Sequence, residues 1–353
     1  MPSKIVQRIE RELGMADLVE ALSTKLPASD LRSLLLEVYQ VRSRAAQESA
    51  ALAQAERDAL VKPSSVSSRD FAAFDLAAFE TAEDFDALDL SPVCPLGVSS
   101  KLGGTHQNNL LTTIRNVEGL GDSTIAMALE AAQRRGTGEV IRLCASHRVI
   151  RLQPFQGSGF TPHFRLFAMV TAGRDSGSWN FETQHLVEHL RVYLSMFRVL
   201  EAGGFAIQNP LVELSDMDAI EAALREAGVS HDEVRQNIRA HWSDGSARFL
   251  AQRGIDLPSD ADHAVLEQAV IEPLRAEFPE ATFRVNQARL EGLGYYRGFA
   301  LRISPQAPDG NRYPVADGGF TDWTARLLAN QKERLLISGI GSELVCKKYR
   351  HAG

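Results

Sequence analysis

The stretch VIRLCASHRVIRLQPFQGSGFTPHFRLFAMVTAGR, residues 140–174, has the pattern of two β-strands joined by a loop. Residues 140–152 and 163–172 are rich in branched and aromatic side chains, and glycine, serine and proline separate them. This pattern is typical of a β-hairpin, so it predicts a sheet with antiparallel strands.

The same stretch contains no Asp or Glu, and it lies in a chain whose formal charge is −7. Its basic residues are Arg142, Arg148, Arg151, Arg165 and Arg174, with His147 and His163. If Arg148 and Arg165 lie on facing strands, their guanidinium groups can bind phosphate or carboxylate oxygens. The alternative is a set of solvated strand faces with surface ion pairs.

Residues 1–66 are expected to form a helical N-terminal segment. With Ser29 as the N-cap, apolar residues recur at helical spacing: Leu31, Leu34, Leu35, Val38 and Tyr39. A proline and four serines between residues 63 and 68 then interrupt the pattern and mark a boundary.

Residues 67–353 mix the periodicities of strands and helices. Further strands are predicted at 283–292, 298–303 and 335–339, and helical patterns dominate about 209–280. This order of elements indicates an α+β core, with an antiparallel sheet flanked by helices and a helical insertion at about 209–280.

Composition excludes several classes of protein. Thirty-eight Lys and Arg against forty-five Asp and Glu disfavour a nucleic-acid partner or an anionic membrane surface. Charged residues interrupt the apolar runs before any could span a membrane, and the N-terminus lacks the apolar core of a signal peptide. Three widely spaced cysteines form neither a disulfide framework nor a zinc motif, so no metal site and a cytoplasmic location are expected. The GxGxxG, Walker A, HExxH and GxSxG patterns are absent.

The motif Gly121-Asp122-Ser123-Thr124 stands directly before a helical pattern at 125–135. Asp122 is therefore a candidate N-cap of that helix. Asp122 and Thr124 can equally bind the ammonium group of an amino-acid-like ligand.

The segment QARLEGLGYYRG, residues 287–298, combines charged, glycine and tyrosine residues. Period-two alternation places Arg289 and Glu291 on one face of a strand, where they either pair with each other or face a ligand. The glycines around Tyr295 and Tyr296 indicate a close approach of the backbone to another group.

Taken in order, these segments resemble the catalytic domain of class II aminoacyl-tRNA synthetases, and within it the histidyl-tRNA synthetase branch. The resemblance covers roughly residues 70–345. It is carried by a first motif at 85–92, the Asp-x-Thr turn at 122–124, a second motif at 147–148 and 163–165, an insertion helix at 214–228, a form of the RGLDYYTG signature at 290–298, a form of the GGRYDGL turn at 318–322, and a third motif at 339–344.

The resemblance implies a site for ATP, with Mg, and for an amino acid. It makes Arg148 the cation on the α-phosphate and hence the catalytic residue, and it places Phe164 on the adenine. The nucleotide site would comprise Arg148, His163, Phe164, Arg165 and Glu343, and the ligand site Asp122, Thr124, Arg289, Glu291, Tyr295 and Tyr296. A homodimer through residues 85–95 is also implied.

Several positions depart from the family pattern. Leu344 stands where the family has an Arg for the γ-phosphate, and Glu291 where it has an Arg that serves in activating histidine. Other departures are Ile150, Gly294, Phe320 and Thr321. A carboxylate cannot stabilise developing negative charge as a guanidinium does. The nine residues after Leu344 are too few for an anticodon-binding domain, so the charging of tRNA is not expected.

Two functions remain open from the sequence. The first is a paralogue that does not charge tRNA and acts as a small-ligand-binding or regulatory subunit, similar in architecture to the regulatory subunit of ATP phosphoribosyltransferase. The second is an ATP-dependent enzyme that activates an amino acid or other carboxylate for an acceptor other than tRNA. Glu291 favours a ligand with a basic or hydrogen-donating group, and the leucine stripe at 31–38 favours contact with a second copy or another protein.

Overall fold

In this computed structural model the described residues are 3–153, 161–241, 244–255 and 264–350. They contain an eight-stranded mixed sheet in the order β1–β4–β5–β10–β9–β8–β6–β7. The strands are β1 (Asp86–Ala87), β4 (Ile141–Ile150), β5 (His163–Arg174), β6 (Gln208–Asp216), β7 (Thr282–Val285), β8 (Arg297–Gln306), β9 (Ala316–Thr321) and β10 (Glu333–Ile340). Only the pairs at the two edges, β1–β4 and β6–β7, are parallel. The predicted α+β fold with an antiparallel sheet is confirmed, because the five inner pairs are antiparallel.

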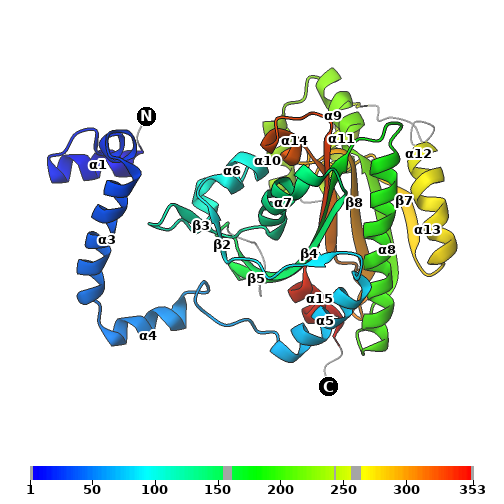
Figure 1. Cartoon of the computed structure of the whole chain (residues 1–353), viewed down its shortest axis with the longest axis horizontal. Coiled ribbons are helices and arrows are strands. Elements are labelled where there is room, and N and C mark those ends of the chain that lie inside the picture. The colour runs from blue at the N-terminus through cyan, green and yellow to red at the C-terminus, as the bar shows by residue number, and fades with distance from the viewer. Residues whose placement is uncertain (1–2, 154–160, 242–243, 256–263, 351–353) are drawn as a thin grey trace.

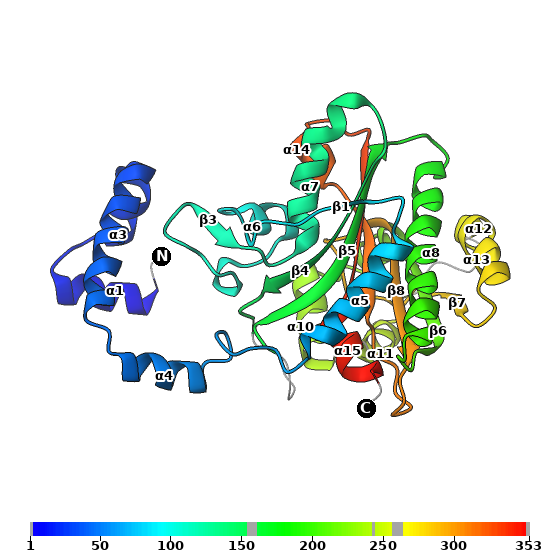
Figure 2. The same cartoon turned by 60° about the horizontal axis from the view of Figure 1, so that its bottom comes forward.

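Helices cover both faces of this sheet (Figures 1 and 2). One face packs against α5 (Ser68–Thr81), α8 (Asn180–Ala202), α12 (Ala264–Leu266), η5 (Glu267–Ile271), α13 (Glu272–Glu277) and α15 (Ser342–Tyr349). The other packs against α7 (Ser123–Arg134), α9 (Met217–Glu226), α10 (His231–His241), α11 (Asp244–Gln252) and α14 (Trp323–Leu327). We refer to these as the α8 face and the α7 face. Each face has its own buried apolar cluster, so the sheet separates two cores.

The hairpin predicted from residues 140–174 is present as β4 and β5, whose residues pair from Ile141 with Ala172 to Ile150 with His163. Side chains alternate along β5: Phe167 packs into the cluster of the α8 face, whereas Leu166 and Ala168 pack into that of the α7 face. A shift of one residue along either strand therefore moves a side chain to the opposite face of the sheet.

The predicted helical insertion begins later than expected. Residues 208–216, which include the first residues assigned to the insertion, form β6 inside the sheet, where Val212 and Leu214 are buried. The helices follow from Met217. The strand predicted at 283–292 is also too long, because β7 ends at Val285 and residues 286–296 form turns.

A small lobe precedes the hairpin. It consists of β2 (Val93–Pro95), α6 (Val98–Gly103), η2 (Gln107–Asn109) and β3 (Val117–Gly119), and η3 (Arg135–Thr137) follows α7. The fully buried Glu118 holds the lobe together, because its carboxylate accepts hydrogen bonds from the amides of Gly97 and Ser99, both at 3.0 Å. These bonds satisfy the first amides of α6, which has no side-chain N-cap.

The N-terminal helical segment is present and lies apart from the sheet in both views (Figures 1 and 2). Its helices are α1 (Lys4–Leu13), α2 (Leu18–Glu20), η1 (Ala21–Lys25), α3 (Ala28–Arg44) and α4 (Glu48–Arg57). The predicted N-cap of α3 is wrong: the helix begins at Ala28 after Pro27, and the Ser29 hydroxyl bonds to Asp30 instead. Within the described ranges, no helix is long and apolar enough to cross a bilayer.

Candidate functional site

A cavity of about 360 Å³ lies on the α7 face, beside the N-terminus of α7. Its walls come from the small lobe, the end of the β4–β5 hairpin, the turns at 292–296, and the paired strands β9 and β10. Of the site residues predicted from the sequence, the cavity brings together Asp122, Thr124, Phe164, Tyr295 and Tyr296.

Asp122 joins the start of α7 to the cavity. Its Oδ1 accepts hydrogen bonds from the Thr124 amide at 3.0 Å and the Thr124 hydroxyl at 2.7 Å, so Asp122 is the N-cap of α7, as the first interpretation predicted. Its Oδ2 accepts from Arg151 Nη2 at 3.1 Å and from the Tyr295 hydroxyl at 3.4 Å. The carboxylate thus organises the polar end of the cavity.

Two tyrosines form the wall contributed by the turns at 292–296. Burial, together with the nearby charge of Asp122, raises the pKa of Tyr295 well above its ordinary value, so its hydroxyl stays a hydrogen-bond donor. The ring of Tyr296 occupies the space where Gly319 has no side chain, because a Cβ there would lie 2.7 Å from Tyr296 Cδ1. The close approach predicted from the glycines of this segment is present at Gly292, where an added Cβ would lie 2.6 Å from Tyr296 Cδ2, so the ring is flanked by Gly292 and Gly319.

Arg151 and Phe164 form a second wall. The Arg151 guanidinium carbon lies 5.4 Å from the centre of the Phe164 ring, and Nε donates to the Gly121 carbonyl at 2.7 Å. The sequence-based site did not include Arg151. Strand alternation could have found it, because Val149 pairs with Phe164 and Arg151 is two residues further on.

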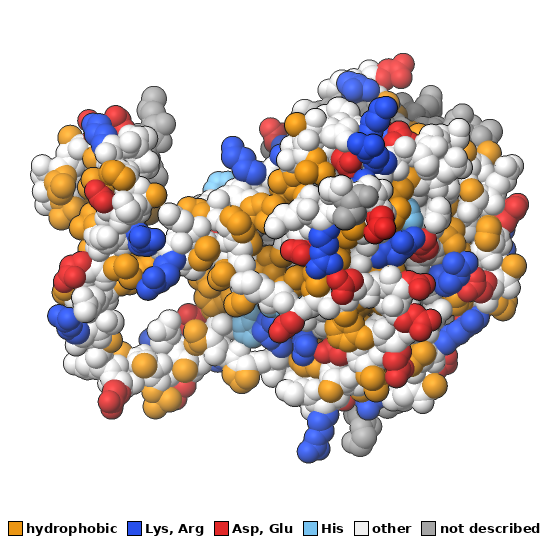
Figure 3. Space-filling model, viewed as in Figure 1, with side chains coloured by type: hydrophobic (Ala, Val, Ile, Leu, Met, Phe, Trp, Pro, Cys, Tyr) orange, Lys and Arg blue, Asp and Glu red, His pale blue; other side chains and the backbone are white. Residues whose placement is uncertain are grey.

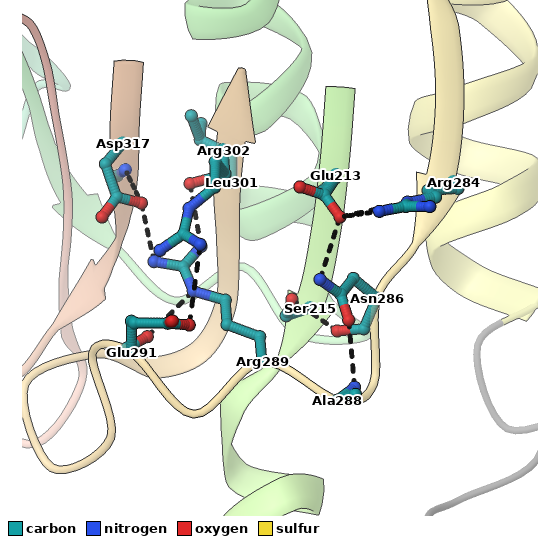
Figure 4. A network of polar contacts seen from close by, with 11 residues as sticks. Glu213, Ser215, Arg284, Asn286, Ala288, Arg289, Glu291, Leu301, Arg302 and Asp317 are labelled. Atoms are coloured by element: carbon teal, nitrogen blue, oxygen red, sulfur yellow. Dashed lines mark hydrogen bonds and ion pairs between the residues drawn. The ribbon is translucent and has the colours of Figure 1, made fainter. Parts of the chain in front are cut away.

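Arg289 does not line the cavity, but it bonds to Asp317, which does (Figure 4). It is 2% exposed, and it donates to Asp317 Oδ1 at 2.6 Å, to the Leu301 carbonyl at 3.0 Å and to the Glu291 carbonyl at 2.9 Å. Its guanidinium carbon lies 5.4 Å from the centre of the Tyr296 ring. Arg289 therefore fixes Asp317, a half-exposed cavity residue that the sequence-based site also missed.

The predicted placement of Glu291 on a strand face shared with Arg289 is wrong. Residues 286–296 form turns, and Gly292 and Gly294 adopt positive φ angles of 91° and 74° that favour glycine. The Glu291 carboxylate points to Arg302, whose Nη1 lies 3.6 Å from Oε2, and it does not line the cavity. The Glu291 carboxylate therefore does not contact a ligand in the cavity and does not select the ligand's charge directly.

The remaining predicted nucleotide residues lie on the opposite face of the sheet from Phe164. Arg148 pairs with Arg165 across the hairpin and shares its face, and Arg165 is next to Phe164 along β5. The predicted grouping of Arg148, His163, Arg165 and Glu343 with Phe164 is therefore wrong in geometry. The resemblance matched residues by their order, whereas one step along a strand reverses the side chain.

Arg148, His163, Arg165 and Glu343 form a compact group that we call the ion-pair cluster. Arg148 Nη1 lies 3.2 Å from Glu343 Oε2 and 3.0 Å from His163 Nδ1, and Arg165 Nη2 lies 2.8 Å from Asp75 Oδ2. Both guanidinium groups also lie over the ring of Phe71, at 5.6 and 5.4 Å. Each of the two arginines thus has a carboxylate partner, and its side chain stays about one-third exposed.

The linker between the N-terminal helices and the core lies on this cluster. Ser64 donates to Glu343 Oε1 at 2.8 Å, and His163 Nε2 lies 2.7 Å from the Lys62 carbonyl. Burial on its own disfavours the charged form of Glu343, but hydrogen bonds from Lys347 and Ser64 and the charge of Arg148 hold its pKa below the ordinary value. The ion-pair cluster therefore attaches the linker to the core through hydrogen bonds.

The absence of acids from the hairpin has a structural explanation. Each of its arginines meets a carboxylate from another part of the chain: Arg142 with Glu188, Arg148 with Glu343, Arg151 with Asp122, Arg165 with Asp75, and Arg174 with Glu333.

Among the described residues, no group of three or more His, Cys, Asp or Glu side chains is arranged to hold a metal ion.

The fold is similar to that of several solved structures. The histidine–tRNA ligase subunit of Alicyclobacillus acidocaldarius aligns with a TM-score of 0.54 and 16% identity, over 79% of this chain and 92% of that one. An ATP phosphoribosyltransferase regulatory subunit/histidyl-tRNA synthetase from Bacillus halodurans aligns at 0.55 and 14%, over 81% and 82%. Histidyl-tRNA synthetase from Nostoc aligns at 0.55 and 14%, over 82% and 74%.

These likenesses show that the chain shares the fold of these histidyl-tRNA synthetase and regulatory-subunit structures, as the sequence motifs suggested. No protein-family model and no curated protein sequence matches the chain.

Proposed function

We propose that this protein is a class II synthetase-like paralogue that does not charge tRNA and binds a small, amino-acid-like ligand as a regulatory subunit. The observation that carries the proposal is the division of the predicted site between the two faces of one hairpin. The α7 face keeps a partly open cavity with polar groups in its wall, whereas Arg148 and Arg165 pair with Glu343 and Asp75 on the α8 face.

The cavity has the size and chemistry of a small-ligand site. Its volume of about 360 Å³ is near the lower end of the range of about 300–1,000 Å³ found for such sites. Tyr295 and Thr124 offer hydroxyl groups, and Asp317 offers a half-exposed carboxylate held in place by Arg289. A compact ligand with donors and acceptors, such as an amino acid, matches these groups.

The same residues fit ATP poorly. Sites for phosphoryl groups use several cations or metal ions to neutralise the phosphates. Arg151 is the one Lys or Arg among the described residues that line the cavity, and Asp122 already pairs with it. The cavity residues therefore do not fit magnesium ATP.

The alternative is the ATP-dependent enzyme that activates a carboxylate. The stacked pair of Arg151 and Phe164 favours it, because a guanidinium over an aromatic ring can hold a flat ring and an anionic group together. This enzyme would need further cations to reach the cavity when the nucleotide binds.

The proposal also includes a protein partner for this chain. The Bacillus halodurans protein that shares this fold is called a regulatory subunit, and this name supports a protein partner for the present chain. A homodimer through residues 85–95 and a cytoplasmic location remain predictions from the sequence and its resemblance.

A thermal-shift screen tests the ligand proposal. We expect one or a few of the twenty amino acids to raise the melting temperature, because a ligand at one hundred times its Kd adds about 2.7 kcal/mol of stability. Tyr295→Phe should weaken this shift several-fold, since the hydroxyl borders the cavity. Tyr313→Phe is the matched control, because the Tyr313 hydroxyl also bonds to an aspartate, Asp309, but lies outside the cavity.

The screen also includes magnesium ATP. Stabilisation by magnesium ATP that Arg151→Ala removes would contradict the proposal and favour the activating enzyme, to be pursued by pyrophosphate exchange with the same amino acids. No shift with any amino acid would count against an amino-acid-like ligand.

A further inference from the structure

The N-terminal arm, which we define as residues 3–61, is unlike the rest of the molecule because none of its residues is buried. It holds five helical segments, of which α1 spans 10 residues and α3 spans 17. The side-chain hydrogen bonds and ion pairs that the structure describes for the arm, such as Arg8 with Glu12, join residues within it. The chain first bonds to the core at Lys62 and Ser64.

Large apolar side chains lie open along this arm (Figure 3). Their exposed fractions range from 44% to 65%, and they are Ile5, Leu13, Met15, Val19, Leu34, Val38, Tyr39, Val41, Leu52 and Val61. Leu34, Val38 and Val41 share one side of α3, and Ile5 and Leu13 share one side of α1. The arm thus presents apolar faces that the core leaves uncovered.

Such an arm is not expected to stay helical in water by itself. Helices shorter than about 12–15 residues are marginal in isolation, and most helical stability in proteins comes from packing an apolar face. The arm supplies no buried residue to offset the entropy lost on ordering its backbone. Its helices therefore need a partner surface.

Charge and area indicate what this surface is. The arm carries eight Lys and Arg against nine Asp and Glu, so two copies can approach without strong repulsion and the arm does not select a highly charged partner. Over the whole arm, ten large side chains exposed by about half present on the order of 900 Å², which is comparable to what one partner contributes to a standard interface.

We propose that the arms of two copies of this chain pair through these apolar faces and form a symmetric helical dimerisation module. The face of α3 that carries Leu34 and Val38 packs against the arm of the second copy. Hydrophobic burial then supplies the stability that the single arm lacks. The proposal does not rest on ligand binding, because no arm residue lines the cavity.

Cysteine cross-linking of the full chain tests this pairing. The three native cysteines are buried, so a cysteine placed on the arm is the exposed thiol. We expect Val38→Cys to give a disulfide-linked dimer rapidly under mild oxidation, because Val38 lies on the apolar face. Gln40→Cys is the matched control two residues along the same helix, on its opposite side, and should cross-link at least tenfold more slowly.

A second measurement keeps the test independent of the oxidation chemistry. Hydrogen exchange should show protected arm amides at high protein concentration and rapid exchange on dilution, while the core stays protected. Leu34→Glu combined with Val38→Glu should remove the arm protection at all concentrations. Equal cross-linking of both cysteine variants, or an arm that stays protected in a monomer, would overturn the proposal.

Discussion

Both faces of the β4–β5 hairpin carry arginines, but only the arginine on the α7 face borders the cavity. On the α8 face, Arg148 and Arg165 pair with Glu343 and Asp75, and the linker donates a hydrogen bond to Glu343 through Ser64. On the α7 face, Arg151 pairs with Asp122 but borders an open cavity. An arginine on this hairpin therefore indicates a ligand site only when its face of the sheet and its ionic partners are known.

The largest expected effect comes from removing the support of the α7 face. Arg289→Ala leaves Asp317 and two backbone carbonyls without their buried donor, so we expect a loss of about 3–5 kcal/mol in the free energy of unfolding. Urea unfolding monitored by circular dichroism measures it. Arg284→Ala is the control, because that arginine also pairs with a carboxylate, that of Glu213, but is 58% exposed, and about 1 kcal/mol or less is expected. A loss as small for Arg289→Ala as for the control would refute the supporting role.

A smaller effect is expected on the α8 face from Glu343→Gln. The neutral amide weakens the interactions with Arg148, Lys347 and Ser64, which should cost about 1–3 kcal/mol at pH 7. Folding lowers the pKa of Glu343 below 4.5, so the folded state binds this proton less readily than the unfolded state. The stabilisation is therefore complete above pH 4.5 and is lost as the pH falls through the lowered pKa.

Unfolding of both proteins between pH 7 and pH 3 checks this sign. The difference between wild type and Glu343→Gln should shrink as the solution becomes more acidic. A difference that grows towards acid pH would contradict a lowered pKa.

The smallest effects on stability, and the sharpest test of the comparison, come from Arg148→Ala and Arg151→Ala. Both side chains are about one-third exposed, so each substitution should cost about 1 kcal/mol or less. Only Arg151→Ala should change the thermal shifts produced by the amino-acid panel, because only Arg151 lines the cavity. If Arg148→Ala altered those shifts instead, the division between the two faces would be wrong.

The sequence predicts much of this fold because its signals are local. The two strands of the hairpin, the helix that follows Asp122 and the order of the motifs can each be read from short patterns, and the structure contains them. The turns at 286–296 could not be read this way, because Arg289 bonds to residues up to 28 positions away. Long-range hydrogen bonds therefore determine the conformation of residues 286–296, although the sequence alternates as in a strand.

The candidate site was predictable in part for a related reason. Asp122, Thr124, Phe164, Tyr295 and Tyr296 lie together at the cavity, whereas Arg148 and Glu343 lie on the other face. Motif resemblance preserves the order of residues but not which way a strand presents them. Asp317 was missed because its role depends on Arg289, which is distant in sequence and buried behind it.

The hydrogen bonds between the linker and the ion-pair cluster affect where the chain can be shortened to prepare the core alone. A shortened protein that starts at residue 67, where the serine-rich stretch ends, would lose the Ser64 hydroxyl and the Lys62 carbonyl and leave Glu343 and His163 open to water. A protein that starts near residue 60 lacks most of the exposed apolar side chains of the arm and keeps both contacts. The useful cleavage point therefore lies several residues before the break in composition.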